Sequence, residues 1–252
     1  MTPKPDEELR LPLWEHLEEL RNILIRSLLA LSVGAIAAYC FCDEIVKFLE
    51  RPLIGVLPEG QRHLYFTGVA DKFLIYFKVS LLSSLILTGP FLLYQAWLFI
   101  SPGLYRHERR FVGAFIAFGS LTFLLGLVFA YYIVIPYGYK FLIEFGGEND
   151  LPIITLKAYF DLTLKLMVAV GLLFEMPVLI VLLGKFGIVT PEILTKYRRH
   201  AMLAISVVSA LVTPSPDAIT LVMVMIPLYL LYEISIFAVR LTNRGKTTEP
   251  NE

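Results

Sequence analysis

Glu175 is the single charged residue in the apolar run Leu166–Gly184, LMVAVGLLFEMPVLIVLLG, which Lys165 and Lys185 flank. About 19 residues at 1.5 Å each span a hydrocarbon core, so we predict a membrane helix with Glu175 near its middle. A charge at that depth costs about 2.5–3.5 kcal/mol and usually faces a cavity or a partner helix. A carboxyl group there could relay protons, or hydrogen-bond a polar group on a partner helix. We predict that it faces the interior of the helix arrangement, where Pro177 bends its helix.

A second group of carboxylates lies near the N-terminus. On a helical wheel, the leucines between positions 13 and 24 share one face, and Glu15, Glu18 and Glu19 share the opposite face. This pattern predicts an amphipathic helix over 12–22 that runs into the first membrane span. A solvated face is the simpler interpretation for Glu15 and Glu18.

A third candidate is the loop 101–110, SPGLYRHERR, in which Glu108 stands among three arginines and a histidine. A local salt bridge that orders the loop would contribute little to stability. From spacing alone, such a salt bridge explains the pattern at least as well as a binding site does.

No catalytic constellation is present in the sequence. A serine protease inside the membrane needs a membrane histidine, but all four histidines fall in or beside loops: His16, His63, His107 and His200. Cys40 and Cys42 are too close for a relaxed disulfide, and no metal-ligand set accompanies them. The net charge is zero, which gives no case for nucleic-acid binding. We therefore expect no enzymatic activity, no cofactor, no metal and no nucleic-acid partner.

Composition indicates a membrane protein. Of 252 residues, 57% are hydrophobic and 17% are charged, whereas soluble domains have about 45–50% and about 25%. Long continuous apolar runs favour helices over barrel strands. They predict one all-α integral membrane domain, 1–252, with six spans and a disordered tail at 244–252. The spans are expected at about 23–41, 73–100, 111–135, 158–184, 197–212 and 217–239.

Lysine and arginine in the connecting segments predict the orientation. One set of segments holds 13 of these residues and the other set holds 6. Because the richer set belongs in the cytoplasm, both termini, 101–110 and 185–196 are expected there. The segments 42–72, 136–157 and 213–216 are then expected outside.

Two segments refine the expected architecture. The fifth run is short and ends in the tight turn TPSP, which predicts a short fifth and sixth helix. The long, half-apolar segment 42–72 is expected to form a cap on the outer surface rather than a loose link. The helices should leave a concave face.

Five stretches, in order along the chain, carry a family resemblance. They are LEELR at 17–21, YQAWLFISPGLYRHERR at 94–110, FEMPV at 174–178, TPEILTKYRRH at 190–200 and TPSPD at 213–217. These stretches resemble the TatC family, the polytopic receptor subunit of the twin-arginine protein translocase. The resemblance covers residues 12 to 240.

The resemblance implies a role for particular residues. Glu19 and Glu108 match the carboxylates that bind the signal peptide. The residues expected to support recognition are Glu15, His16, Arg21 and Arg106. Glu175, next to Pro177, matches the membrane-buried glutamate and is expected to dock a partner. Pro52 and Asp217 match functional residues of the outer loops.

The resulting expectation is a receptor subunit in the inner membrane for export of folded proteins. Its implied partners are twin-arginine signal peptides, single-span subunits of the TatA/TatB type, further copies in a larger complex, and membrane lipid. The proton-motive force is the implied energy source. The alternative is a proton-coupled secondary transporter that uses Glu175 as a relay, but the sequence lacks the duplicated halves typical of that class.

Overall fold

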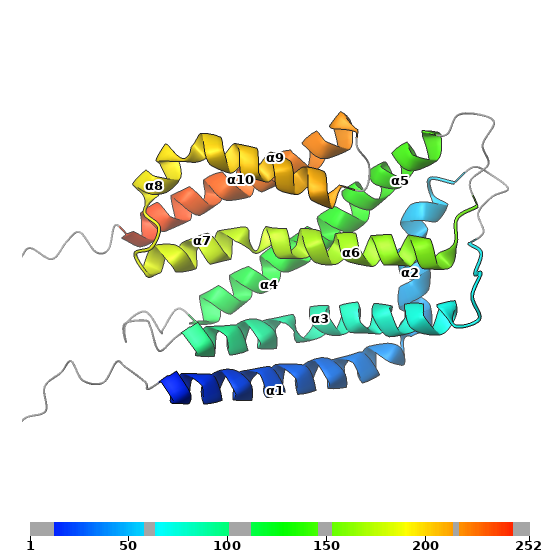
Figure 1. Cartoon of the computed structure of the whole chain (residues 1–252), viewed down its shortest axis with the longest axis horizontal. Coiled ribbons are helices and arrows are strands. Elements are labelled where there is room, and N and C mark those ends of the chain that lie inside the picture. Colours follow the sequence, from blue (N-terminus) through cyan, green and yellow to red (C-terminus); the bar gives the residue numbers. More distant parts are fainter. Residues whose placement is uncertain (1–12, 58–63, 101–111, 146–152, 214–216, 244–252) are drawn as a thin grey trace, which may run out of the picture.

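Apolar helices along the long axis of the molecule make up most of the structure (Figure 1). This computed structural model describes residues 13–57, 64–100, 112–145, 153–213 and 217–243. Its helices are α1 (Leu13–Tyr39), α2 (Cys42–Ile54), α3 (Asp71–Ile100), α4 (Val112–Phe129), the π-helical turn η3 (Ala130–Val134), α5 (Ile135–Glu144), α6 (Leu156–Phe174), α7 (Met176–Lys185), α8 (Pro191–Lys196), α9 (Arg198–Val212) and α10 (Ala218–Asn243).

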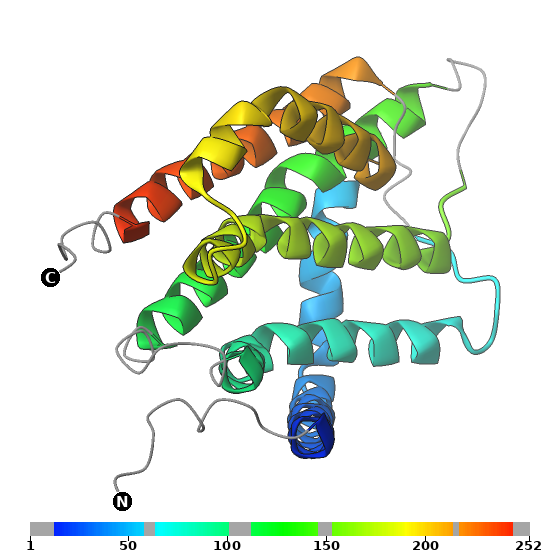
Figure 2. The ribbon, with the colours of Figure 1, turned by 60° about the vertical axis from the view of Figure 1, so that its left-hand side comes forward.

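The bundle has two distinct ends. At one end, α1 and α4 begin, α3, α7 and α10 finish, and α8 lies beside them (Figure 1); we call it the α8 end. At the other, α2 crosses the direction of its neighbours in both views (Figures 1 and 2); we call it the α2 end. The segment expected as an outer cap therefore holds a helix, α2, which packs against α3, η3 and α5.

Helix α6 lies at the centre of the packing. It contacts α3, α4, η3, α7, α9 and α10, and its side chains Tyr159, Phe160 and Thr163 are fully buried. The Tyr139 hydroxyl of α5 donates to the Tyr159 carbonyl at 3.0 Å. By contrast, α1 packs chiefly on α3, where Gly34 lets the helices approach closely. A Cβ at Gly34 would lie 2.6 Å from the Ser84 hydroxyl oxygen.

Five helical runs in the described residues are long and apolar enough to cross a bilayer: Leu17–Tyr39, Asp71–Phe99, Val112–Glu144, Leu156–Lys185 and Ala218–Leu241. Helix α9 has 15 residues, or about 22 Å at 1.5 Å each, and agrees with the short fifth helix. A total of six spans stays a prediction.

Two helix boundaries differ from the sequence prediction. The sixth helix is not short, because α10 has 26 residues. The third run does not end at 135 but continues through η3 and α5 to Glu144. Pro136 is the second residue of α5, two positions after η3 ends, and a proline removes one helical hydrogen bond, which accounts for the π-helical turn before it. The helix expected at 12–22 runs into the first span within one continuous helix, α1.

Candidate functional site

Carboxylates from α1 line a depression at the α8 end. Its volume is 450 Å³, and its walls are formed by Glu18, Glu19, Asn22, Ile23, Arg26 and Leu98. The α1 residues occupy one face of two helical turns, and Leu98 comes from the last turn of α3. With two carboxylates and one guanidinium, the depression carries an excess negative charge of one.

The other residues of this predicted site are only partly described. Glu108 and Arg106 lie outside the described residues, as do the side chains of Glu15 and His16. Arg21 is exposed on α1. Leu98 is two residues before the end of α3 at Ile100, so α3 ends beside the depression, and Glu108 follows eight residues later in the sequence.

Glu175 interrupts the fourth predicted span at the point that the sequence suggested. Helix α6 ends at Phe174 and α7 begins at Met176. Pro177 has no backbone N–H to donate to the Leu173 carbonyl four residues earlier, which explains the break. The backbone of Glu175 still bonds to Leu172 and Leu179, so the two helices continue in nearly one line.

The Glu175 side chain faces a cavity between α3, α4 and α6. The cavity has a volume of 280 Å³ and a mostly apolar wall that includes Pro90, Leu93, Ser120 and Leu172. Within the described part of the chain, the carboxyl group forms no hydrogen bond, and the Ser120 hydroxyl is also buried without one. The otherwise apolar cavity therefore offers a ligand two polar groups, the Glu175 carboxyl and the Ser120 hydroxyl.

Sequence reasoning missed the α4 side of this cavity. A Cβ at Gly119 would lie 3.3 Å from the Glu175 carboxyl oxygen and 2.9 Å from a Leu93 methyl. The absence of a side chain at Gly119 thus makes room for the carboxyl group. Helix α4 is apolar around its whole circumference, so no periodicity marks which face meets Glu175.

An ion pair within the spans also escaped the sequence analysis. Lys78 of α3 and Asp161 of α6 form a salt bridge. Both lie inside predicted spans, and opposite charges at such positions commonly pair. Two residues of opposite charge inside predicted spans were the signal available in the sequence, and the pair joins α3 to α6 toward the α2 end.

Pro52 has a structural explanation in the fold. It lies inside α2, where its missing N–H leaves the Phe48 carbonyl, four residues earlier, without a helical donor. The Tyr131 hydroxyl of η3 donates to that carbonyl at 2.8 Å, and its ring stacks on Phe48 at 4.5 Å. Pro52 therefore leaves the Phe48 carbonyl free to accept the hydrogen bond from Tyr131, which joins α2 to η3.

Tyr131→Phe should lower the free energy of unfolding by about 1–3 kcal/mol, because the Phe48 carbonyl loses its donor while the ring stacking remains. Denaturant unfolding of the purified protein in detergent measures the change. Tyr132→Phe is the matched control, since that exposed hydroxyl makes no hydrogen bond among the described residues. Equal losses in the two variants would contradict the assignment. Adding Pro52→Ala to the Tyr131→Phe variant gives the Phe48 carbonyl a backbone N–H donor, and should recover part of the lost free energy of unfolding.

Asp217 caps a helix. Its carboxylate accepts a hydrogen bond of 2.7 Å from the Thr220 backbone N–H, directly before α10 begins. This geometry is that of an N-cap, which satisfies a free donor in the first turn. An acidic residue at this position is thus explained by local structure.

The arrangement of helices and the sequence both match known proteins. The profile of the family described as "Sec-independent protein translocase protein (TatC)" matches residues 15–227. The chain belongs to the TatC family. The TatC protein of Desulforapulum autotrophicum is 41% identical over 246 residues, which cover 98% of this chain and 90% of that protein. The TatC protein of Escherichia coli K12 is 38% identical over 239 residues, covering 94% and 92%.

A solved TatC structure has the same fold. The crystal structure described as "Twin Arginine Translocase Receptor- TatC" superposes with a TM-score of 0.75 and 38% identity, covering 91% of this chain and 100% of that one. The predicted all-α membrane fold and the predicted family are thereby confirmed. This TatC-family chain is a multi-pass membrane protein of a protein translocase.

Proposed function

We propose that this TatC-family protein is a receptor in the inner membrane that binds twin-arginine signal peptides at its cytoplasmic face. The observation that carries the proposal is the depression at the α8 end, where Glu18 and Glu19 lie beside the end of α3. Glu108 follows the last residue of α3, Ile100, by eight positions in the sequence. Glu19 and Glu108 would then share one peptide.

Carboxylates are suitable partners for this ligand. A twin-arginine motif presents two guanidinium groups that remain charged at any physiological pH and bind carboxylates through two parallel hydrogen bonds. Each charge-assisted hydrogen bond contributes about 1.5–3 kcal/mol. Two such pairs, together with burial of an apolar peptide segment, give a binding free energy of about 8 kcal/mol, which corresponds to a micromolar dissociation constant. That affinity suits a receptor that must release its cargo.

The Glu175 cavity is the proposed docking place for a single-span partner subunit. Its apolar wall fits a membrane helix, and its two available polar groups, Glu175 and Ser120, fit a polar side chain on that helix. Hydrogen bonds between membrane helices contribute about 0.6–2 kcal/mol. Assembly with TatA/TatB-type subunits and further copies, driven by the proton-motive force, belongs to the same proposal.

The proposal of a proton-coupled transporter has less support. Glu175 lies near the middle of a predicted span, as a proton relay would. The sequence, however, lacks the two repeated halves that are typical of secondary transporters. The relatives are described as protein translocase proteins.

Peptide binding to oriented vesicles tests both the receptor role and the orientation. Inverted vesicles, which expose the cytoplasmic face, should capture a twin-arginine peptide, and right-side-out vesicles should not. The twin-lysine version of the peptide should bind at least about tenfold more weakly, because lysine lacks the planar fork. Equal binding of the two peptides, or binding to right-side-out vesicles alone, would refute the proposal.

A further inference from the structure

A basic groove lies where α8 and α9 meet α10. Thr195, Lys196, Arg198, Arg199, Met202 and Tyr229 line a hollow of 410 Å³, which we call the basic groove. It is separate from the depression on α1 and from the Glu175 cavity, because it shares no lining residue with either.

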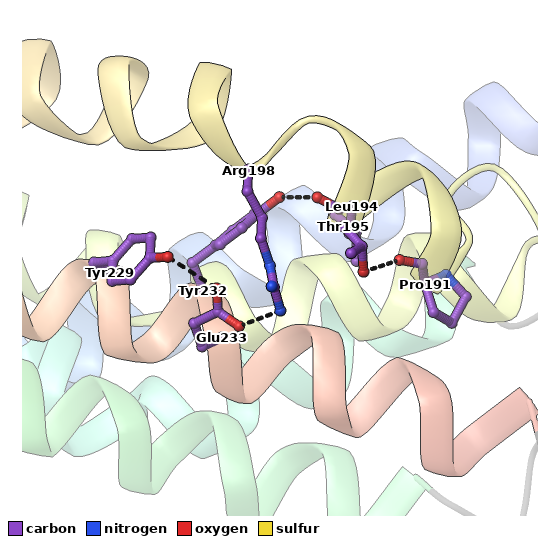
Figure 3. A network of polar contacts seen from close by, with 7 residues as sticks. All are labelled: Pro191, Leu194, Thr195, Arg198, Tyr229, Tyr232 and Glu233. Atoms are coloured by element: carbon purple, nitrogen blue, oxygen red, sulfur yellow. Dashed lines mark hydrogen bonds and ion pairs between the residues drawn. The ribbon is translucent and has the colours of Figure 1, made fainter.

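A polar network joins two lining residues of the groove, Arg198 and Tyr229, through Glu233 of α10 (Figure 3). The Arg198 Nη2 atom donates to Glu233 Oε2 at 2.8 Å, and the Tyr229 hydroxyl donates to Glu233 Oε1 at 3.0 Å. The Tyr232 hydroxyl also donates to the Leu194 carbonyl at 2.8 Å, which fixes α8 on α10. The groove is therefore built by contacts between three helices rather than by a loose surface loop.

The groove carries uncompensated positive charge. Glu233 neutralises Arg198, whereas no ion pair joins Lys196 or Arg199 to a carboxylate among the described residues. Both side chains are exposed. Two cationic groups thus remain available to an anionic ligand, one of them a guanidinium fork suited to phosphate.

The position of the groove along α9 places it at the depth of lipid headgroups. Leu203, Val207 and Leu211 are exposed at intervals of four residues, which is the pattern of a face in contact with acyl chains. Arg199 precedes Leu203 by four residues, or about 6 Å of helix. Tyr197 is exposed beside them, as aromatic residues at the membrane–water interface commonly are.

We propose that the basic groove binds the phosphate headgroup of an anionic phospholipid from the leaflet at the α8 end. Lys196 and Arg199 bind the phosphate, and the acyl chains of the lipid lie along the exposed face of α9 that begins at Leu203. Basic pockets between membrane helices on the cytoplasmic side bind such headgroups. A twin-arginine signal is excluded as occupant because its charge has the same sign as the groove.

The test compares two double variants with the same loss of charge. Lys196→Gln with Arg199→Gln removes both groove cations, and Lys140→Gln with Arg240→Gln removes one lysine and one arginine outside it. Binding of phosphatidylglycerol to the purified full-length protein in neutral detergent is measured by native mass spectrometry, with phosphatidylcholine and inorganic phosphate as comparison ligands. The groove variant should bind phosphatidylglycerol about 30-fold more weakly, and each single groove substitution about fivefold.

The control variant should keep the affinity of the parent, and phosphatidylcholine should not distinguish the variants. Equal phosphatidylglycerol affinity in the groove and control variants would overturn the proposal. Full competition by millimolar inorganic phosphate would also overturn it, because the ligand would then be a soluble anion. If the double groove variant does not fold, the single substitutions Lys196→Gln and Arg199→Gln decide the question in the same assay.

Discussion

Glu19→Gln and Glu108→Gln should each weaken the binding of a twin-arginine peptide by about tenfold or more. Glutamine keeps the shape of the side chain and removes its charge, so the loss measures the charge-assisted hydrogen bond to a guanidinium group. Such a bond contributes about 1.5–3 kcal/mol, and about 1.4 kcal/mol corresponds to a factor of ten. A labelled peptide titrated against the purified protein in lipid nanodiscs gives the affinity.

Glu192→Gln provides the matched control for this experiment. Glu192 is exposed on α8, at the same end of the bundle but outside the depression. Hydrogen bonds from its own backbone N–H and from the Thr190 side chain hold the pKa of its carboxyl group below the ordinary value. Its replacement therefore removes one negative charge at neutral pH without touching the proposed site. Unchanged peptide affinity in both the Glu19 and the Glu108 variants would refute the recognition hypothesis.

Glu175→Ala should weaken association with a single-span partner by about 3- to 30-fold, which corresponds to about 0.6–2 kcal/mol for an interhelical hydrogen bond. Glu175→Gln should retain much of the association, because an amide also donates and accepts hydrogen bonds. Cross-linking yield, or fluorescence transfer between labelled subunits in the same bilayer, measures the difference.

The competing interpretation is that Glu175 stabilises its own chain. Its carboxyl group forms no hydrogen bond within the described residues, so Glu175→Ala should change the thermal stability of the isolated protein little. Ser120→Ala is a second probe, since its hydroxyl shares the cavity. A marked loss of thermal stability in Glu175→Ala with undiminished partner cross-links would show that the residue is an internal contact and not a docking group.

The sequence alone determined the features that depend on local chemistry and on bilayer thickness. Apolar length located the helices, because a hydrocarbon core of fixed thickness demands about 20 apolar residues. Pro177 predicted a bend beside Glu175, and the structure ends α6 at Phe174. The short fifth helix followed from a short apolar run before a proline-rich turn. Each signal lies within a few residues of the feature that it predicts.

Helix ends beyond the apolar runs were less predictable. Helix α5 extends to Glu144, nine residues beyond the expected end at 135, and α10 extends to Asn243, four residues beyond the expected end at 239. Hydropathy marks where a chain enters lipid, but backbone hydrogen bonding decides where the helix ends. The expected short sixth helix was wrong because the apolar run of α10, Ala218–Leu241, has 24 residues and is long enough to cross a bilayer.

The tertiary structure decided which helix faces meet and which polar groups share a site. Tyr131 reaches the Phe48 carbonyl across 83 residues, and Arg198 reaches Glu233 across 35. Gly119 makes room for the Glu175 carboxyl group although nothing in the apolar sequence of α4 distinguishes that face. In a bilayer, lipid and protein interior are similarly apolar, so periodicity does not separate a packed face from an exposed one. The sequence therefore located the carboxylates along the chain, and packing between helices determined the cavity and the groove around them.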